Sequence, residues 1–371
     1  MIKFCKICLN PSTRPNAVFN HEDVCSVCLY EDNKLNKKEW LMRDEKLSKI
    51  VKWAKKNKTS SYDCIIPISG GKDSYRQSFY VRDKLKLKPL LVCNSYPPEQ
   101  TTDIGDKNLD NLVKKGFDLI KISLNPVLWK KLYKHSFNLH GNMLIASEMA
   151  LYGTPVHLCL AYKIPLMFYG ENPAHTIGEM HGSSDFDASG IRYGNTINGG
   201  IRKLRYNFRS DQDFYFYQYP SRERVNEFNT KIVYLGYFMK DWYGHKNAQL
   251  AIKNGLKVRT DKPQNTGDLW GFTGLDDDFR LVNQFLKYMK FGFGHVTDQV
   301  CEAIHQKFMS RKEAIDIVKK YDGKIHKKYI KKFCNYVDMP IEEFWRNVDE
   351  IVNKELFIKK NGKWIRNFEI K

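Results

Sequence analysis

The feature that most constrains the fold is a glycine-rich hexapeptide that directly follows a short apolar run. Residues 64–68 have the composition of a buried strand, the sequence SGGKDS follows at residues 69–74, and the next residues have a helical pattern. Two adjacent glycines allow a tight turn that points successive N–H groups into one concavity, and the helix adds the positive end of its dipole. Lys72 offers a positive charge to a phosphate, and Asp73 carries the oxygen that Mg²⁺ prefers. The hexapeptide therefore predicts a strand–loop–helix unit that binds an anion.

Three further apolar runs have the length and composition of buried strands. They cover residues 89–93, 117–122 and 165–169, and segments with helical patterns lie between them. One of these helices has a predicted start at Thr154, which can serve as its N-cap with Pro155 as its first residue. Strands that alternate with helices are typical of a doubly wound parallel sheet, so we predict a fold of the α/β class.

Four of the nine cysteines form two closely spaced pairs. Cys5 and Cys8 are separated by two residues, as are Cys25 and Cys28, and sixteen residues lie between the pairs. Two such knuckles complete a tetrahedral zinc site, with an oxygen-labile iron centre as the alternative. Because four thiolates close the coordination, we expect a structural ion and not a catalytic one. The other cysteines are isolated in sequence and predicted to be buried thiols: Cys64, Cys93, Cys159, Cys301 and Cys334.

The chain is strongly basic, with 61 Lys and Arg residues against 42 Asp and Glu residues and a formal net charge of +19. This excess fits an anionic partner, which could be a nucleic acid, a membrane surface or a phosphorylated small molecule. An AT-rich genome also produces an abundance of Lys, Asn and Ile, so the positive charge alone does not identify nucleic acid as the partner. No apolar run approaches the length of a membrane span, and the first residues lack the apolar core of a signal peptide. We therefore expect a cytoplasmic protein that does not bind membranes.

The hexapeptide differs from the Walker motif and from the dinucleotide fingerprint. It resembles the SGGxDS pyrophosphate loop (PP-loop) of the ATP pyrophosphatases, which include GMP synthetase, NAD synthetase, asparagine synthetase and the tRNA thiolation and lysidine enzymes. The resemblance implies a fold of the adenine nucleotide alpha hydrolase type, in which ATP adenylylates a substrate oxygen and pyrophosphate leaves. It also implies catalytic roles for Lys72 and Asp73, Mg²⁺ on Asp73, and ATP binding by Ser69, Gly70, Gly71, Lys72, Asp73 and Ser74.

Four other segments narrow the resemblance to one family. They are GENPA at residues 170–174, KFGFGHVTD at 290–298, RKEAI at 311–315 and YDGK at 321–324. Together with the cysteine pairs they resemble the N-acetyl sugar amidotransferase family, which includes the pseudaminic acid biosynthesis protein A type and related O-antigen enzymes. This family resemblance extends over nearly the whole chain. It implies that ATP and ammonia convert an acetamido group of a bacterial surface sugar into an acetamidino group, with AMP and pyrophosphate as products, in O-antigen or flagellar glycan biosynthesis.

On this basis we divide the chain into three regions. They are a zinc-binding ribbon at residues 1–40, a PP-loop domain at 41–240 and a mainly helical region at 241–371. Within the last region, Ser310 and Glu313 have the spacing of a capping box, which predicts a helix that begins there.

Several further residues are candidates for the site because they follow predicted strands or flank glycines. Glu171 is predicted to be catalytic, either as a ligand of a second Mg²⁺ or by orienting ammonia, and the alternative is a helix or turn cap. The remaining candidates are Gly170 and Asn94 near ATP, and Asn172, Lys290 and His295 near the substrate. Asn94 fits a simple turn equally well, and Lys290 and His295 fit a packing turn with two core phenylalanines. We expect three other histidines to be ordinary polar residues: His175, His181 and His245.

The chain shows no sign of its own ammonia source. Its second residue is Ile2 and none of its cysteines lies in a G-x-C-x-G elbow, so we expect a separate glutaminase subunit as a partner, as the family resemblance also implies. Two other functions remain open: a tRNA-modifying PP-loop enzyme of the lysidine or thiolation type, and a non-enzymatic zinc-ribbon protein that binds nucleic acid. The residues do not identify the sugar, the acetamido position, the carrier nucleotide or the oligomeric state.

Overall fold

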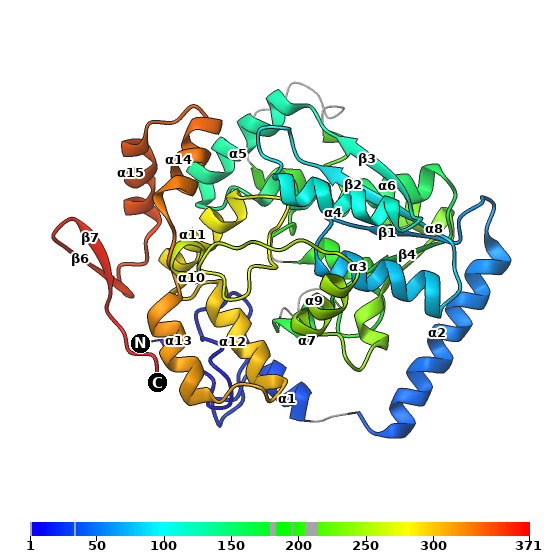
Figure 1. Cartoon of the computed structure of the whole chain (residues 1–371), viewed down its shortest axis with the longest axis horizontal. Helices are drawn as coiled ribbons and strands as arrows, with labels where there is room; N and C mark the ends of the chain where they lie inside the picture. Colours follow the sequence, from blue (N-terminus) through cyan, green and yellow to red (C-terminus); the bar gives the residue numbers. More distant parts are fainter. Residues whose placement is uncertain (1, 33–34, 179–182, 195, 205, 207–213) are drawn as a thin grey trace.

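The computed structural model describes residues 2–32, 35–178, 183–194, 196–204, 206 and 214–371. Its centre is a five-stranded parallel sheet with the order β3-β2-β1-β4-β5 (Figure 1). All four predicted strands are confirmed, whereas β5 has only four residues and was not predicted from the sequence. The strands are β1 (Cys64–Pro67), β2 (Pro89–Ser95), β3 (Asp118–Ser123), β4 (Leu166–Tyr169) and β5 (Lys231–Tyr234).

The strand order places a crevice at the carboxyl end of β1. This strand pairs with β2 on one side and with β4 on the other: the chain adds β2 and β3 on one side of β1 and then crosses to β4 on the other side. Open α/β sheets bind ligands at such a switch point, because the loops after the two central strands separate there. The hexapeptide follows β1 and Glu171 follows β4, and the topology therefore places them on the two sides of one crevice.

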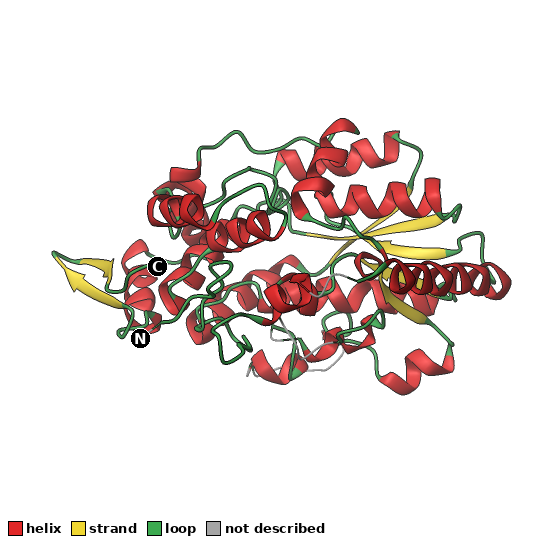
Figure 2. Ribbon diagram, turned by 90° about the horizontal axis from the view of Figure 1, so that it is seen from below, coloured by secondary structure: helices red, strands yellow, loops and turns green. Residues whose placement is uncertain are grey.

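Helices cover both faces of the sheet, which confirms the doubly wound architecture (Figure 2). Ile65 and Val92 face the core that contains α5 and α6, whereas Ile66 and Leu91 face the core that contains α2, α3 and α4. This alternation explains why the strands are apolar on both faces. The covering helices are α2 (Lys37–Asn57), α3 (Lys72–Phe79), α4 (Asp103–Lys114), α5 (Pro126–His140) and α6 (Ile145–Ala161).

The predicted helix start at Thr154 is wrong. Helix α6 begins nine residues earlier, at Ile145, and continues through Pro155. Residues on the N-terminal side of the proline, such as Met149, are buried in the core, and their burial outweighs the one backbone hydrogen bond that Pro155 removes. The Thr154 hydroxyl donates to the carbonyl of Phe216 at 3.4 Å and does not cap a helix.

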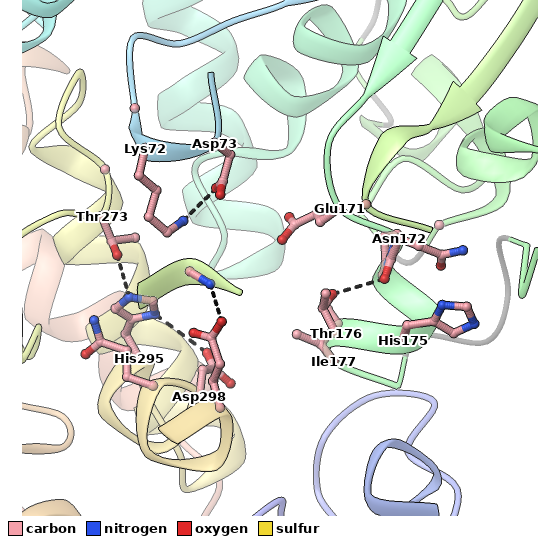
Figure 3. A pocket seen from close by; sticks show the side chains of 18 of the residues that line it. Lys72, Asp73, Glu171, Asn172, His175, Thr176, Ile177, Thr273, His295 and Asp298 are labelled. Atoms are coloured by element: carbon pink, nitrogen blue, oxygen red, sulfur yellow. Dashed lines mark hydrogen bonds and ion pairs between the residues drawn. The ribbon is translucent and has the colours of Figure 1, made fainter. Parts of the chain in front are cut away.

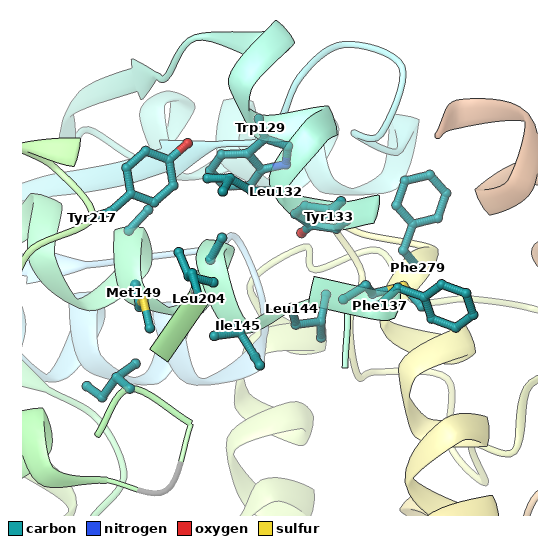
Figure 4. Close-up of a cluster of buried hydrophobic side chains, with 14 of the residues drawn as sticks. Trp129, Leu132, Tyr133, Phe137, Leu144, Ile145, Met149, Leu204, Tyr217 and Phe279 are labelled. Carbon is teal, nitrogen blue, oxygen red and sulfur yellow. The ribbon is translucent and has the colours of Figure 1, made fainter. Parts of the chain in front are cut away.

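The C-terminal part is mainly helical, as predicted, and Figure 4 shows how it packs on the sheet domain. Phe279 of α11 lies beside Tyr133 and Phe137 of α5 in one buried cluster. The capping box is confirmed, because the Ser310 side chain accepts a hydrogen bond from the Glu313 amide. The antiparallel hairpin of β6 and β7 was not predicted. These elements are α11 (Phe279–Phe291), α12 (His295–His305), α13 (Arg311–Tyr321), α14 (Lys327–Tyr336), α15 (Ile341–Ile351), β6 (Phe357–Lys360) and β7 (Lys363–Arg366).

The four paired cysteines belong to an N-terminal lobe that packs against the C-terminal helices (Figure 1). Its cysteines share a buried cluster with Val296 and Val300 of α12 and Ala314 of α13. Packing therefore crosses the predicted domain boundaries, and those boundaries stay predictions. Within the described residues, no helix has both the length and the apolarity that crossing a bilayer requires. The smaller elements are α1 (Ser26–Asp32), η1 (Tyr80–Lys84), α7 (Pro173–Thr176), η2 (Ala188–Tyr193), η3 (Gly200–Leu204), α8 (Arg222–Glu227), η5 (Leu235–Phe238), α9 (Gly244–Lys253) and α10 (Pro263–Thr266).

Candidate active site

A cavity of about 820 Å³ opens at the carboxyl ends of β1 and β4. The hexapeptide, the segment after β4, the N-terminal lobe and helices α11 and α12 all contribute to its wall. Three candidates from the sequence, Gly70, Asn94 and Gly170, are not among the described residues that line it. The candidates that do line it are Ser69, Gly71, Lys72, Asp73, Ser74, Glu171, Asn172, Lys290 and His295.

The hexapeptide forms a closed loop that leaves the start of α3 free. The Ser69 amide donates to the Ser74 hydroxyl oxygen at 3.0 Å, and Gly70 has a φ of +77°, which an L side chain rarely adopts. Gly71 is the N-cap of α3, and no side chain caps the helix there. The N–H groups of the first turn therefore have no intrahelical partner, which is the arrangement that binds phosphate.

Three carboxylates surround the ammonium group of Lys72. Its Nζ donates to Asp73 at 2.6 Å, and Asp73 also accepts a hydrogen bond from Asn247 at 2.8 Å. Burial alone would lower the pKa of Lys72, but Asp73, Glu171 and Glu302 together raise it above its ordinary value. The lysine is therefore a permanent cation at neutral pH.

Glu171 faces Lys72 and Asp73 from the opposite side of the cavity (Figure 3). Removal from bulk water, followed by the negative charge of Asp73, raises the pKa of its carboxyl group, while Lys72 opposes the shift. A carboxylate with a raised pKa is a stronger base than one at the protein surface. Next to it, the backbone of Gly170 lies so close to Gln77 and Trp242 that an added Cβ would be 2.7 Å from the Gln77 amide nitrogen.

Asn172 lines the cavity but has a structural role. Its side-chain oxygen caps α7 by accepting from the Ala174 amide at 2.9 Å, and its side-chain nitrogen donates to the carbonyl of Asp185 at 2.7 Å. Both ends of the amide are thus occupied within the protein. Asn94 is not a turn residue, because β2 continues to Ser95 and Asn94 is buried in register with Ile122 of β3.

Lys290 lies in the last turn of α11, and His295 is the first residue of α12. Gly292, with a φ of +76°, ends α11. Of the two phenylalanines of the predicted packing turn, Phe293 is buried, whereas Phe291 is only partly buried and lines the cavity. Both polar side chains nevertheless reach the cavity wall. Lys290 donates to the carbonyl of His140 at 2.8 Å, and the His295 ring lies 3.0 Å from the Thr273 hydroxyl (Figure 3).

A group of charged residues that sequence patterns did not reveal completes this part of the site. Arg280 of α11 lies near Glu148, Asp276 and Glu171, whose charges raise its pKa against the effect of burial. Burial in turn raises the pKa of Asp276 to about 6. The Arg280 Nε has no hydrogen-bond partner among the described residues. On a sequence, the polar face of an amphipathic helix such as α11 looks the same whether it meets solvent or a cavity, so no local signal marks Arg280.

The sulfur atoms of the four paired cysteines have the geometry of a metal site. All four Sγ atoms lie within 4.8 Å of one another, and the Cys5–Cys28 and Cys8–Cys25 pairs are each 3.7 Å apart. Four sulfurs at about 2.3 Å from a central Zn²⁺ would lie about 3.8 Å apart, so the cluster fits this ion. Nε2 of His305, on α12, lies 3.2 Å from the Cys28 Sγ and supports the cluster from outside.

The remaining histidines differ in environment. His175 stacks on Tyr30 with ring centroids 4.0 Å apart and lines the cavity, and burial followed by the charge of Arg43 lowers its pKa to about 4. His245 packs against aromatic side chains, with its ring centroid 5.0 Å from that of Phe308. His181 lies outside the described residues.

The C-terminal part of the chain matches a known protein family. Residues 271–370 match a family model described as the C-terminal domain of WbpG-like LPS biosynthesis proteins. The matched segment contains α11 and α12, and therefore Arg280, Lys290, His295 and Glu302 of the cavity wall. No curated protein matches the chain. The match supports an enzyme family of lipopolysaccharide and O-antigen biosynthesis.

Proposed function

We propose that the protein is an ATP-dependent amidotransferase that converts an acetamido group of a bacterial surface sugar into an acetamidino group. The observation that carries the proposal is the uncapped start of α3, which lies in one cavity with Lys72, Asp73 and Glu171. The WbpG-like match of the C-terminal region supports a sugar of lipopolysaccharide biosynthesis as the substrate.

In this proposal the triphosphate of ATP binds at the start of α3. The free N–H groups of the first turn and the Lys72 ammonium group hold its negative charge. Asp73 offers carboxylate oxygens of the kind that Mg²⁺ prefers, with Glu171 and Glu302 nearby. Mg²⁺, when bound, would neutralise charge on the phosphates.

The chemistry has two steps. The acetamido oxygen attacks the α-phosphorus, the new C–O–P linkage forms, the bond between the α- and β-phosphates breaks and the amide proton is released. Ammonia then attacks the activated carbon, the C–O bond to AMP breaks, and an amidine remains. The first step converts a poor leaving group into a good one, which ammonia alone cannot do.

We assign proton transfer in the second step to Glu171. Its raised pKa brings it closer to neutral pH, where a carboxylate can both accept and return a proton. The ammonium group of Lys72 is permanently charged and cannot act as this base.

Ammonia is proposed to come from a separate glutaminase subunit. All nine cysteines are buried, and none of them lines the cavity as the described residues define it. A thiol nucleophile for glutamine hydrolysis or for sulfur transfer is therefore not supported, which also weighs against a tRNA thiolation enzyme. Lysidine-type tRNA modification needs no such thiol and remains the second candidate.

One experiment separates these functions. The protein is incubated with ATP, Mg²⁺, ammonium and, in parallel, UDP- and CMP-linked N-acetyl sugars, free nonulosonic acids and tRNA, and pyrophosphate and product mass are measured. We expect pyrophosphate release with one class of N-acetyl sugar and a product 1 Da lighter, because NH replaces O. Release with tRNA alone would refute the proposal. Lys72→Ala and Asp73→Asn should abolish the release while bound zinc stays unchanged.

A further inference from the structure

One end of the cavity carries more positive than negative charge. Arg14 of the N-terminal lobe and Lys287 and Lys290 of α11 line it, together with Asp298 of α12. We call these four residues the cationic end. Three of the four residues are cations and one is a carboxylate, so the group itself has an excess of two positive charges.

Asp298 forms ion pairs with two of the cations, and the His295 ring also lies near it, with Nδ1 3.8 Å from a carboxylate oxygen. Its oxygens lie 2.5 Å from Arg14 and 2.5 Å from Lys287, and these partners hold the pKa of Asp298 well below its ordinary value despite burial. The Arg14 side chain is only 10% exposed, so these charges lie well below the protein surface. A second acid, Asp322, also acts on Lys287, but backbone amides of Gly294 and Val296 bind its oxygens and it does not line the cavity.

Lys290 has no carboxylate partner in the described part of the chain. Its ammonium group donates to the carbonyl of His140 at 2.8 Å, which uses one of three N–H bonds. Burial, and then the charge of Lys203, lowers the pKa of Lys290 to about 8. A partly buried cation that lacks a counterion is unfavourable, and an anionic ligand would offset that cost.

The cationic end lies at a fixed distance from the phosphate-binding loop. Glu302 approaches Lys72, and Asp298 precedes it by one turn on α12, so the two positions are about 6 Å apart along the helix. On α11, Arg280 lies near Glu171, and Lys287 follows about 10 Å farther along. A ligand with its reacting group beside Glu171 could therefore place a second group at the cationic end.

We propose that Arg14, Lys287 and Lys290 form a subsite for an anionic group of the sugar substrate, a phosphate or a carboxylate. The subsite includes a residue of the metal-binding lobe, because Arg14 lies between Cys8 and Cys25 in sequence and the Thr13 hydroxyl donates to the carbonyl of Phe291 at 2.5 Å. The lobe thus forms a wall of the site. The identification of the ligand as the sugar substrate rests on the proposed function, whereas the binding of an anion at this subsite does not.

The test compares Lys290→Met with Lys290→Arg, which keeps the charge, and with Lys319→Met, which removes an exposed charge on α13. UDP and N-acetylneuraminic acid are titrated by calorimetry as probes of a phosphate and a carboxylate. We expect Lys290→Met to weaken the binding of one probe at least ten-fold, because a charged hydrogen bond contributes at least a factor of ten to affinity. Lys290→Arg should retain most of the affinity, and Lys319→Met should leave the binding of both probes unchanged. The probe that responds identifies the anionic group.

Kinetics on the active substrate provide the second readout. Lys290→Met should raise the KM for the sugar about ten-fold or more and leave the KM for ATP unchanged. Arg14→Gln should act in the same direction, and its melting curve shows whether it folds. Unchanged binding of both probes and an unchanged KM for the sugar in Lys290→Met would overturn the subsite. If no N-acetyl sugar supports pyrophosphate release, the proposed function fails, and the calorimetry still decides the subsite.

Discussion

Gly71→Ser tests whether the start of α3 binds the triphosphate. Gly71 is the N-cap of α3 and has an extended backbone, with φ of −85°, which any residue can adopt. An added Cβ would meet only the Ser69 hydroxyl oxygen, at 3.4 Å, which is an ordinary contact. Serine is a preferred N-cap residue, so its side chain should accept a hydrogen bond from an N–H of the first turn.

The substitution should affect stability and ATP binding in opposite directions. A serine N-cap in place of glycine should raise the free energy of unfolding by a few tenths of a kcal/mol. The same N–H group would then be unavailable to a phosphate oxygen, and a lost charged hydrogen bond costs about 1.5–3 kcal/mol. The affinity for ATP should therefore fall about 10- to 150-fold.

Chemical denaturation and calorimetric titration of ATP in the presence of Mg²⁺ measure the two effects. Gly71→Ala is the matched control, since it adds the same Cβ without a hydroxyl and separates steric blocking from capping. Gly71→Ala should lower the stability slightly, because alanine is a poor N-cap, and should reduce the affinity for ATP less than Gly71→Ser does. A Gly71→Ser protein that binds ATP with unchanged affinity would show that the triphosphate does not use the N–H groups of α3.

Three further predictions concern the metal site, a buried acid and the environment of Lys72. Cys8→Ser should lower bound zinc, measured by atomic absorption, together with the melting temperature, because a structural metal contributes folding energy; unchanged stability would mean that the cluster holds no metal. Asp277 has a pKa that burial raises to about 7, above its unfolded value, so its contribution to stability is present at acidic pH and lost as the pH rises through 7. Asp277→Asn should remove this loss. The free energy of unfolding of the variant, measured by urea titration, should therefore rise relative to that of wild type by at most about 4 kcal/mol between pH 4 and 8. A difference in unfolding free energy that stays constant across this range would contradict the raised pKa of Asp277. Glu302→Gln can still accept from the Gly244 amide and should bind ATP a few-fold more tightly, since one negative charge next to Lys72 is lost; weaker binding would instead indicate that Glu302 is a metal ligand.

Local signals predicted the parts of the fold that depend on neighbouring residues. The strand–loop–helix unit at the hexapeptide and the two cysteine pairs each depend on residues within a few positions of one another. Thr154 was misread because a Thr-Pro pair has the same local pattern at a helix start and within a buried helix. What decides between the two is the burial of α6 against the sheet, which no short window of sequence contains.

The missed site residues depend on contacts between distant parts of the chain. Arg14 binds Asp298, which is 284 positions away in the sequence, and Glu302 approaches a loop that begins at Ser69. Each of these residues lies on a helix or in a loop where a charged side chain is ordinary. Only the fold brings them into one cavity, so neither composition nor spacing could identify them.

Helix α12 explains how the separate motifs form one site. Asp298, Glu302 and His305 have the spacing i, i+4 and i+7, which places them on one face of the helix. Asp298 binds Arg14 of the N-terminal lobe, Glu302 approaches Lys72, and His305 contacts the Cys28 sulfur. Because a helix is stiff, a displacement of the metal-binding lobe would move the carboxylate next to Lys72 as well. Helix α12 therefore joins the cysteine cluster to the loop at residues 69–74, although the two lie far apart in the sequence.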